Sequence, residues 1–519
     1  KVRDLMAQAR SGAAALVLFP ELTLSGYPPE DLLIRPSFLQ ACASELNALA
    51  STTDGIVAVV GHPYDEGELY NGASVLRERQ VECTATKQVL PNYGVFDDMR
   101  YFRPGHSTTT IVIDGVRVGL LVCEDIWQSE PAARAAAAGA ELIVVINASP
   151  WDVAKQSARE ATLSARARET GCAIAYLNLV GGQDELVYDG ASMLVNADGN
   201  IAARAPAFAD VLLFARFDAD SRTLHAENWP AVAVADIMPE ATLYAALTRG
   251  IRDYVDKNGS HGVLLGLSGG IDSALTLALA VDALGPERVS AVMMPTRFTS
   301  QLSLDGARAQ AAHLGVAYHV IDIEPTYQAF LGSLAPAFAG AAADTTEENL
   351  QARIRGVLLM ALSNKHHRFV LSTGNKSETA VGYATLYGDM CGAYAPLKDV
   401  YKTLVYRLAR WRNEAGNPRS AIPQEVIDRP PSAELRADQT DQDSLPPYDQ
   451  LDAILERFIE GEQSSADIVL AGFDAPTVQR VVRLVLINEF KRRQSAPGPR
   501  VTIRAFGRER RYPITSGWS

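Results

Sequence analysis

The sequence predicts an α/β protein built from two domains. Short apolar runs typical of strands alternate with longer helical segments along most of the 519 residues, a pattern that indicates sheets covered by helices. At roughly 100–200 residues per domain, this length suffices for two or three domains with cores of their own. The alternation weakens between residues 218 and 239, where we expect a linker. The predicted domains therefore span residues 1–217 and 240–519.

The first half contains seven candidate strands that are rich in Val and Ile, as expected for buried sheets. They are Ala15–Phe19, Ile56–Gly61, Thr110–Ile113, Val118–Cys123, Leu142–Asn147, Ala173–Leu177 and Met193–Val195. Ala- and Arg-rich segments between them, such as Pro131–Ala138 and Ser157–Glu169, are predicted as helices. This half therefore reads as one α/β domain.

The second half is predicted to begin with a helix from Glu240 to about Asn258 and to continue as a second α/β sheet. A glycine-rich turn separates the first strand from a helix over Ala274–Leu284. The candidate strands are Val263–Leu267, Val289–Met293, Ala317–Ile321 and Phe369–Ser372. Two segments, Leu331–Thr346 and Gln424–Pro447, are rich in Ala and Gly or in Pro and charge, and we expect loops there, either plain surface loops or lids over a site.

Composition excludes several classes of protein. The net charge of -13 argues against non-specific binding to nucleic acid or to an anionic membrane, because both require a basic face. No apolar run reaches the roughly 18 residues of a membrane-spanning helix. Five scattered cysteines without CxxC spacing do not form a disulfide framework or a zinc site, which fits a reducing cytoplasm. Since the chain starts at Lys1, we expect that the true start is missing rather than that a signal peptide is present.

A glycine-rich turn between a predicted strand and a predicted helix is the first candidate site. Its glycines allow backbone amides to approach an anion, and the helix N-terminus favours phosphate. An acidic residue within such a loop requires a cation beside the phosphates, and Mg²⁺ has the preference for oxygen ligands that this implies. The candidate phosphate-binding residues are Gly266, Leu267, Ser268, Gly269, Gly270, Ile271, Asp272 and Ser273.

The loop resembles the SGGxDS pyrophosphate loop of the N-type ATP pyrophosphatases, which split ATP into AMP and pyrophosphate. Further segments resemble the motifs of NAD synthetases, so that the resemblance covers nearly all of 240–519 and implies a Rossmann-like parallel-sheet domain. These segments are 348–355, 372–378, 382–389 and 396–402.

The resemblance to NAD synthetases also implies roles for residues outside the loop. Thr373 and Lys402 would contact ATP, and Glu378 would share Mg²⁺ with Asp272. Plainer interpretations remain open for four of the other residues: an ordinary helical position for Asn349, a surface salt bridge for Arg353 and for Arg355, and a solvated basic cluster for Lys491. The residues implied to contact deamido-NAD are Asn349, Arg353, Glu378, Asp389 and Lys491.

The second candidate site is in the first half, where Cys123 ends a strand. A free thiol has a pKa of about 8.5 and is mostly protonated at neutral pH, so a nucleophilic cysteine needs a base and a cation nearby. Glu21 closes one predicted strand, and Lys87 opens the segment that runs to Asp97. All three lie at strand ends or in the following loops, where α/β sheets carry their chemistry.

These segments resemble the nitrilase, or carbon-nitrogen hydrolase, superfamily, whose fold is an α-β-β-α sandwich. The resemblance implies that Glu21 is the general base, Cys123 attacks the amide of glutamine, and Lys87 stabilises the oxyanion. It further implies that Tyr93, Ser149 and Lys155 bind glutamine, although Ser149 also suits a turn cap and Lys155 a surface charge.

Together the two resemblances predict a ligase that hydrolyses glutamine to glutamate and ammonia, adenylates deamido-NAD with ATP and Mg²⁺, and aminates it to NAD. The resemblance to NAD synthetases also implies a homo-oligomer joined through the synthetase domains, and the cysteine pattern predicts a cytoplasmic protein. An amidotransferase of the same ATP pyrophosphatase class with another acceptor is an alternative. A catalytically silent nucleotide sensor is a third, although such a protein would be expected to have lost one of Glu21, Lys87, Cys123 or Asp272.

Overall fold

A computed structural model describes residues 1–229, 239–416 and 418–517. These residues form two compact units, the first comprising 1–183 and 187–229 and the second comprising 239–517 together with 184–186. Residues 230–238 of the predicted linker 218–239 lie outside the described residues.

The first unit contains two main sheets and two strand pairs. One sheet has the order β1-β2-β3-β4, with β1 (Leu16–Leu18), β2 (Val57–Asp65), β3 (Leu69–Arg77) and β4 (Gln80–Thr86). The other has the order β12-β11-β8-β7-β6-β5, with β5 (Thr109–Ile113), β6 (Val116–Val122), β7 (Leu142–Asn147), β8 (Ala173–Asn178), β11 (Met193–Val195) and β12 (Ile201–Arg204). The strand pairs are β9 (Val180–Gln183) with β10 (Leu186–Asp189), and β13 (Ala215–Asp218) with β14 (Thr223–Ala226).

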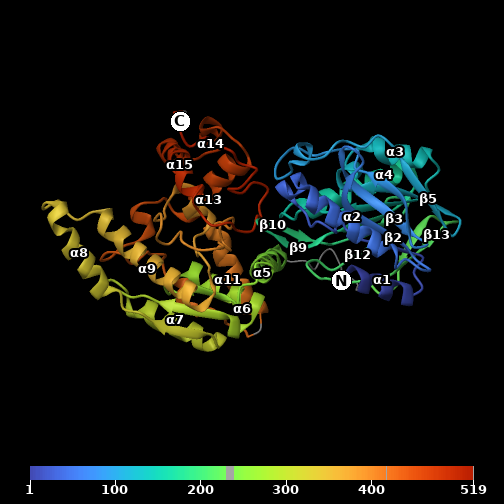
Figure 1. Cartoon of the computed structure of the whole chain (residues 1–519). Helices are drawn as coiled ribbons and strands as arrows, with labels where there is room; N and C mark the ends of the chain where they lie inside the picture. The colour runs from blue at the N-terminus through green and yellow to red at the C-terminus, as the bar shows by residue number, and fades with distance from the viewer. Residues whose placement is uncertain (230–238, 417, 518–519) are drawn as a thin grey trace. The chain divides into compact units, whose positions relative to one another are not determined.

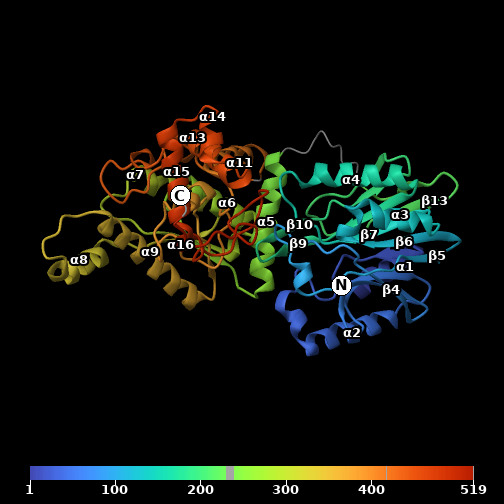
Figure 2. The same cartoon turned by 90° about the horizontal axis from the view of Figure 1, so that it is seen from above.

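The two main sheets face each other and helices cover their outer faces. Val59 and Val75 of one sheet and Leu120 and Val144 of the other share a buried core. The helices are α1 (Val2–Ser11), α2 (Pro36–Ala50), α3 (Ser129–Ala137) and α4 (Lys155–Thr170). Figure 2 shows the order of layers, with α3 and α4 along one side and α2 along the other. The predicted α-β-β-α sandwich is confirmed.

Strands β3 and β4 and the β13–β14 pair were absent from the sequence prediction. The β3–β4 hairpin is interrupted by polar and small residues, so it lacks the continuous apolar run that marks a buried strand. Strand β14 falls inside the segment 218–239 that was expected to be a linker, and its Leu224 is buried in the inter-sheet core. The four residues of β14 include only two apolar ones, Leu224 and Ala226, which is too weak a pattern to distinguish a strand from a connecting loop.

The second unit is built on a parallel four-stranded sheet of order β17-β16-β15-β18. Its strands are β15 (Val263–Gly266), β16 (Val289–Met293), β17 (Ala317–Val320) and β18 (Phe369–Val370). Helices α6 and α7 pack on one face, and α9 packs on the other. The helices up to the last strand are α5 (Pro239–Lys257), α6 (Ile271–Leu284), α7 (Gln301–Leu314), α8 (Glu324–Phe338) and α9 (Thr345–His366). The predicted Rossmann-like domain is confirmed.

The remaining helices of this unit, drawn in orange and red in Figure 1, are α10 (Lys376–Val381), α11 (Lys402–Ala415), α12 (Gln424–Asp428), α13 (Tyr448–Leu455), α14 (Ser465–Leu470), α15 (Ala475–Ile487) and α16 (Glu489–Arg492). Helices α10, α13, α14 and α15 share a core of their own, whereas α12 packs on α6, α7 and α11. The predicted loop at Leu331–Thr346 is largely helical, since α8 continues to Phe338. The alanines that suggested a loop there are strong helix formers. No helix among the described residues combines the length and apolarity needed to cross a bilayer.

The buried His62 of β2 makes the stability of the first unit depend on pH. Its Nδ1–H donates to the Pro63 carbonyl at 2.8 Å, and its Nε2 lies 2.7 Å from the Ser74 hydroxyl oxygen. Burial lowers the pKa of His62 from 6.5 to about 4. Between these two values the unfolded chain binds more protons than the folded one, so stability increases with pH across this window and is lost as the pH falls.

When the pH falls from 7 to 5, we expect protonation of His62 in the unfolded chain to lower the unfolding free energy of the first unit by about 2 kcal/mol. His62→Gln should therefore show a smaller loss over this interval in urea unfolding, whatever its stability at pH 7. His106→Gln, at an exposed position, is the matched control and should behave as the wild type does. An identical pH dependence in His62→Gln and wild type would contradict the expectation.

Candidate active sites

Cys123 begins a short 3-10 turn, residues 123–126, at the carboxyl end of β6. Its φ of 48° is in the left-handed region that non-glycine residues seldom adopt, a strain that is common at catalytic positions. Asp125 stabilises the turn, because its carboxylate accepts from the backbone N–H groups of Val122, Gln88 and Val89. Burial raises the pKa of Asp125 to about 6. The turn and the segment after β4 are thereby held together.

The structure brings Glu21, Lys87 and Cys123 together in a buried cluster. Lys87 Nζ lies 2.8 Å from Glu21 Oε1, which also accepts from Asn71 Nδ2 at 2.7 Å. Glu21 Oε2 accepts from the backbone N–H of Ala148 at 2.8 Å. Burial and Glu21 raise the pKa of the buried Cys123 thiol well above its ordinary value, while Lys87 lowers it. The charges of Glu21 and Lys87 therefore both act on the thiol.

Asp98 belongs to the same cluster and was missed by the sequence analysis. Its Oδ2 lies 2.7 Å from Lys87 Nζ, and its Oδ1 accepts from the Tyr27 hydroxyl at 3.2 Å. Burial raises the pKa of Asp98, and Lys87 lowers it. The two carboxylates fix the lysine between them. Nothing in the sequence distinguishes Asp98 from its neighbour Asp97, because only the fold buries one of them.

Two of the three predicted glutamine-binding side chains lie near Glu124, the residue after the cysteine. The half-exposed Tyr93 donates its hydroxyl to Glu124 Oε1 at 2.9 Å. The Lys155 ammonium lies 4.3 Å from the centre of the Trp127 ring. Burial lowers the pKa of Lys155, whereas Cys123 and Glu124 act in the opposite direction. Cys123 acts electrostatically on both side chains, which places them near its thiol.

Ser149 is buried in a separate polar cluster that the sequence did not reveal. Its Oγ accepts from Arg159 Nε at 3.3 Å, and Arg159 also donates to the Ser149 carbonyl. Arg159 Nη1 donates to both carboxylate oxygens of Asp189, each at 2.8 Å. The hydroxyl of Ser149 thus has internal partners, and its contact with glutamine stays a prediction.

The phosphate loop lies between β15 and α6, as predicted. The hydroxyls of Ser268 and Ser273 are 3.1 Å apart, and Ser268 Oγ accepts from the Gly270 N–H. Gly269 has a φ of 82°, and a Cβ there would lie 2.5 Å from the carbonyl oxygen of Ser303. Both the conformation and the close approach of α7 require glycine at this position.

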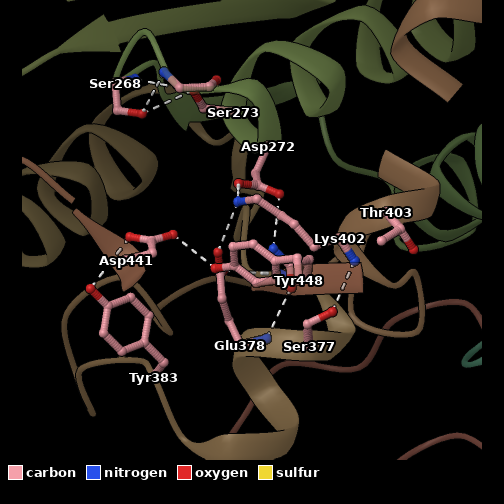
Figure 3. Close-up of polar contacts among 12 residues, drawn as sticks. Ser268, Asp272, Ser273, Ser377, Glu378, Tyr383, Lys402, Thr403, Asp441 and Tyr448 are labelled. Atoms are coloured by element: carbon pink, nitrogen blue, oxygen red, sulfur yellow. Dashed lines mark hydrogen bonds and ion pairs between the residues drawn. The ribbon is translucent and has the colours of Figure 1, made fainter. Parts of the chain in front are cut away.

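Lys402 lies between two carboxylates next to this loop (Figure 3). Its Nζ is 2.5 Å from Asp272 Oδ2 and 3.1 Å from Glu378 Oε1. Although burial lowers the pKa of Lys402, the two carboxylates raise it more. Burial raises the pKa of Glu378 to about 8, and Lys402 opposes this rise. Asn375 Nδ2 orients Asp272 by donating to Oδ1 at 2.9 Å.

The donor set formed by Asp272 and Glu378 suits Mg²⁺. Both groups are carboxylates, and Mg²⁺ commonly takes one or two carboxylates and completes its shell with water and phosphate oxygens. Among the described residues, no group of three or more His, Cys, Asp or Glu side chains forms a complete metal site. The two carboxylates would therefore hold the ion only together with a phosphate ligand.

One cavity collects most of the predicted nucleotide-binding residues, and the segment 429–435 after α12 lines one wall. The predicted residues on its surface are Gly266, Leu267, Ser268, Gly270, Ile271, Asp272, Ser273, Thr373, Glu378, Asp389 and Lys402. The sequence analysis missed other lining residues, among them Tyr383, Thr385, Arg429 and Asp441. Asp441 accepts from the hydroxyls of Tyr448 and Tyr383 beside Lys402 (Figure 3).

Three predicted residues, Asn349, Arg353 and Lys491, do not line the cavity and instead contact the segment 382–389. Asn349 Oδ1 accepts from Thr385 Oγ1 at 2.7 Å, and Arg353 Nε donates to the Leu386 carbonyl at 3.2 Å. Lys491 Nζ donates to two carbonyls of the segment, each at 2.8 Å. They support the wall that carries Asp389, and direct contact with a nucleotide stays a prediction.

The sequence as a whole matches two known domain families. Residues 1–226 match the family described as carbon-nitrogen hydrolase, and residues 243–495 match the family described as NAD synthase. The chain is thus a carbon-nitrogen hydrolase joined to an NAD synthase. Similar curated proteins include the glutamine-dependent NAD(+) synthetases of Xanthomonas campestris, 55% identical over 100% of this chain and 94% of that protein, and of Acinetobacter baylyi, 50% identical over 98% and 94%.

Solved structures of similar proteins match the whole chain as well. The glutamine-dependent NAD+ synthetase of Acinetobacter baumannii in complex with ADP is 47% identical, has a TM-score of 0.79, and covers 100% of this chain and 95% of that chain. The enzyme of Cytophaga hutchinsonii, 22% identical with a TM-score of 0.82 over 99% and 94% of the two chains, shares the fold. The chain belongs to the family of glutamine-dependent NAD(+) synthetases. It is therefore a ligase with a nitrilase-type glutaminase domain and an NAD synthase domain, for which ATP is a substrate.

Proposed function

We propose that the two clusters described above are the two active sites of one reaction, with ammonia as the intermediate. The first would release ammonia from glutamine, and the second would adenylate deamido-NAD and aminate it to NAD. The observation that supports this most strongly is the arrangement of Glu21, Lys87 and Cys123. The Lys87 ammonium lies 2.8 Å from the Glu21 carboxylate, and both charges act on the buried Cys123 thiol.

In the first site, Glu21 takes the thiol proton as Cys123 Sγ attacks the side-chain amide carbon of glutamine. The positive charge of Lys87, held by Glu21 and Asp98, faces the oxyanion that forms; one such donor is worth about 2.7–4 kcal/mol in other enzymes. The proton passes to the leaving nitrogen and ammonia departs. Glu21 then activates water, which hydrolyses the thioester and releases glutamate. Tyr93, Ser149 and Lys155 hold the amino-acid end.

In the second site, amides of the loop 268–273 bind the phosphates of ATP, supported by the positive end of α6. Asp272 and Glu378 would hold Mg²⁺, which neutralises phosphate charge when bound. Lys402 binds the departing pyrophosphate, and Thr373 contacts ATP. Asp389, supported by Asn349, Arg353 and Lys491, borders the deamido-NAD whose carboxylate attacks the α-phosphorus. Ammonia then displaces AMP.

Purified protein supplied with ATP, Mg²⁺, deamido-NAD and glutamine is expected to form NAD, AMP, pyrophosphate and glutamate in equal amounts. Chromatographic quantification of the four products tests this. Replacing deamido-NAD with other carboxylic acids should stop AMP formation. If the protein instead acts on a different acceptor, AMP should form with one of those acids and not with deamido-NAD. Absence of NAD with both glutamine and ammonia as nitrogen source would refute the proposal.

We also propose that the protein is a cytoplasmic homo-oligomer with a boundary between its domains in the segment 218–239. The net charge of -13 and the lack of a spanning helix among the described residues are compatible with an aqueous compartment. Light scattering on the purified protein should give a mass at least twice the 55.9 kDa of one chain. A mass equal to one chain at micromolar concentration would contradict the oligomer.

A further inference from the structure

The partly buried Arg355 of α9 lines the nucleotide cavity and differs from the buried arginines of the chain. Its Nε donates to the carbonyl of Met294, just after β16, at 3.0 Å. No carboxylate of the described residues lies within ion-pair distance of its guanidinium. By contrast, Arg159, Arg412 and Arg492 are each paired with a carboxylate at 2.9 Å or less. The surface salt bridge considered for Arg355 from the sequence is therefore absent in the described structure.

The two carboxylates whose charges act on Arg355, Glu434 and Asp389, are bonded to other groups. Glu434 accepts from the hydroxyls of Ser300 and Ser303, at 2.7 and 2.9 Å. Asp389 Oδ1 accepts from the backbone N–H of Thr385 at 2.6 Å. Neither carboxylate is placed to neutralise Arg355, so its terminal nitrogens remain for a group that enters the cavity.

A partly buried cation without a partner loses hydration that no ion pair restores. Burial accordingly lowers the pKa of Arg355 to about 10. The guanidinium has a planar set of donors that matches the oxygens of a phosphate or a carboxylate, and its anchored Nε orients the other two nitrogens. The side chain is thus oriented and charged before any ligand binds.

We propose that Arg355 binds an anionic oxygen group, phosphate or carboxylate, of a nucleotide in this cavity. The inference rests on the proposed function, in which this cavity receives both ATP and deamido-NAD. The shared chemistry is an oxyanion that accepts two hydrogen bonds from the terminal nitrogens. Either nucleotide can supply such a group, and separate titrations identify the source.

The test is calorimetric titration of the full chain with α,β-methylene ATP plus Mg²⁺, and separately with deamido-NAD. Arg355→Met should weaken binding of the nucleotide that Arg355 contacts by about 10–100-fold. Arg355→Lys keeps the charge but loses the planar donor set, and should weaken the same nucleotide by about 3–10-fold. Lys365→Gln is the matched control, since it removes an exposed charge from the same helix and should leave both Kd values within twofold.

The outcomes separate this inference from the function on which it rests. Wild type that binds neither nucleotide would refute the proposed function. Wild-type Kd values for both nucleotides in Arg355→Met and Arg355→Lys would overturn only the role of Arg355. A purely structural arginine would lower the unfolding temperature of the unliganded variants without changing either Kd. If Arg355→Met does not fold, Arg355→Lys decides, and unchanged binding by that variant overturns the inference.

Discussion

Cys123→Ala is expected to abolish glutamine-dependent NAD formation, by at least about 10³-fold in kcat, and to leave ammonia-dependent formation intact. The thiol is the one nucleophile in the Glu21–Lys87–Asp98 cluster, and neither the base nor the cation can replace it. The synthetase residues lie in the other unit, so added ammonium salt supplies what the damaged site does not. The variant should also stop forming glutamate from glutamine.

The measurement is NAD formation with glutamine and with ammonium chloride, alongside glutamate release. Cys83→Ala is the control, because Cys83 is a half-buried cysteine of β4 whose thiol is under the influence of Glu82 and Arg77. It should retain both activities. Loss of both activities in Cys123→Ala would mean that this cysteine supports folding rather than chemistry.

Asp272→Asn is expected to lower NAD formation from either nitrogen source by at least about 10²-fold. The substitution removes the carboxylate that lies 2.5 Å from Lys402 and one of the two oxygen donors that we assign to Mg²⁺. Glutamate release should continue, because the glutaminase cluster is in the first unit. The pattern is the reverse of that for Cys123→Ala.

Pyrophosphate release with deamido-NAD and ammonia measures this directly, and calorimetry with Mg²⁺ and α,β-methylene ATP reports binding apart from catalysis. Asp305→Asn, at an exposed position of α7, is the control and should be indistinguishable from wild type. If Asp272→Asn forms NAD at the wild-type rate, the assignment of this carboxylate to the metal and phosphate site is wrong.

The sequence was sufficient to predict elements and candidate sites whose residues are consecutive in the chain. The loop 268–273 needs glycines, a helix start and an acid within six consecutive residues, so its neighbours in sequence are its neighbours in space. The strands at Leu142–Asn147 and Val289–Met293 were predicted with the bounds that the structure has, because buried parallel strands are continuous apolar runs.

Polar residues that act through distant partners could not be found in this way. Asp98 reaches Lys87 only because the chain folds back over the end of β4, and Arg159 meets Asp189 across 30 residues of sequence. Ser149 was predicted at the glutamine site, yet Arg159 engages its hydroxyl inside the protein. Hydrogen-bond partners of this kind are set by packing, which no spacing rule along the chain encodes.

By itself, the sequence determined two α/β domains, a carbon-nitrogen hydrolase and an NAD synthase, and predicted Glu21, Lys87 and Cys123 as the catalytic residues of the first. Those features depend on residue types in short motifs. Only the tertiary structure decided how the motifs are completed: that Asp98 holds Lys87, that Lys402 lies between Asp272 and Glu378, and that Arg355 lines the cavity with no carboxylate of the described residues as its partner. Burial removes water from these charges, and whether each has a partner depends on side chains brought together from separate elements.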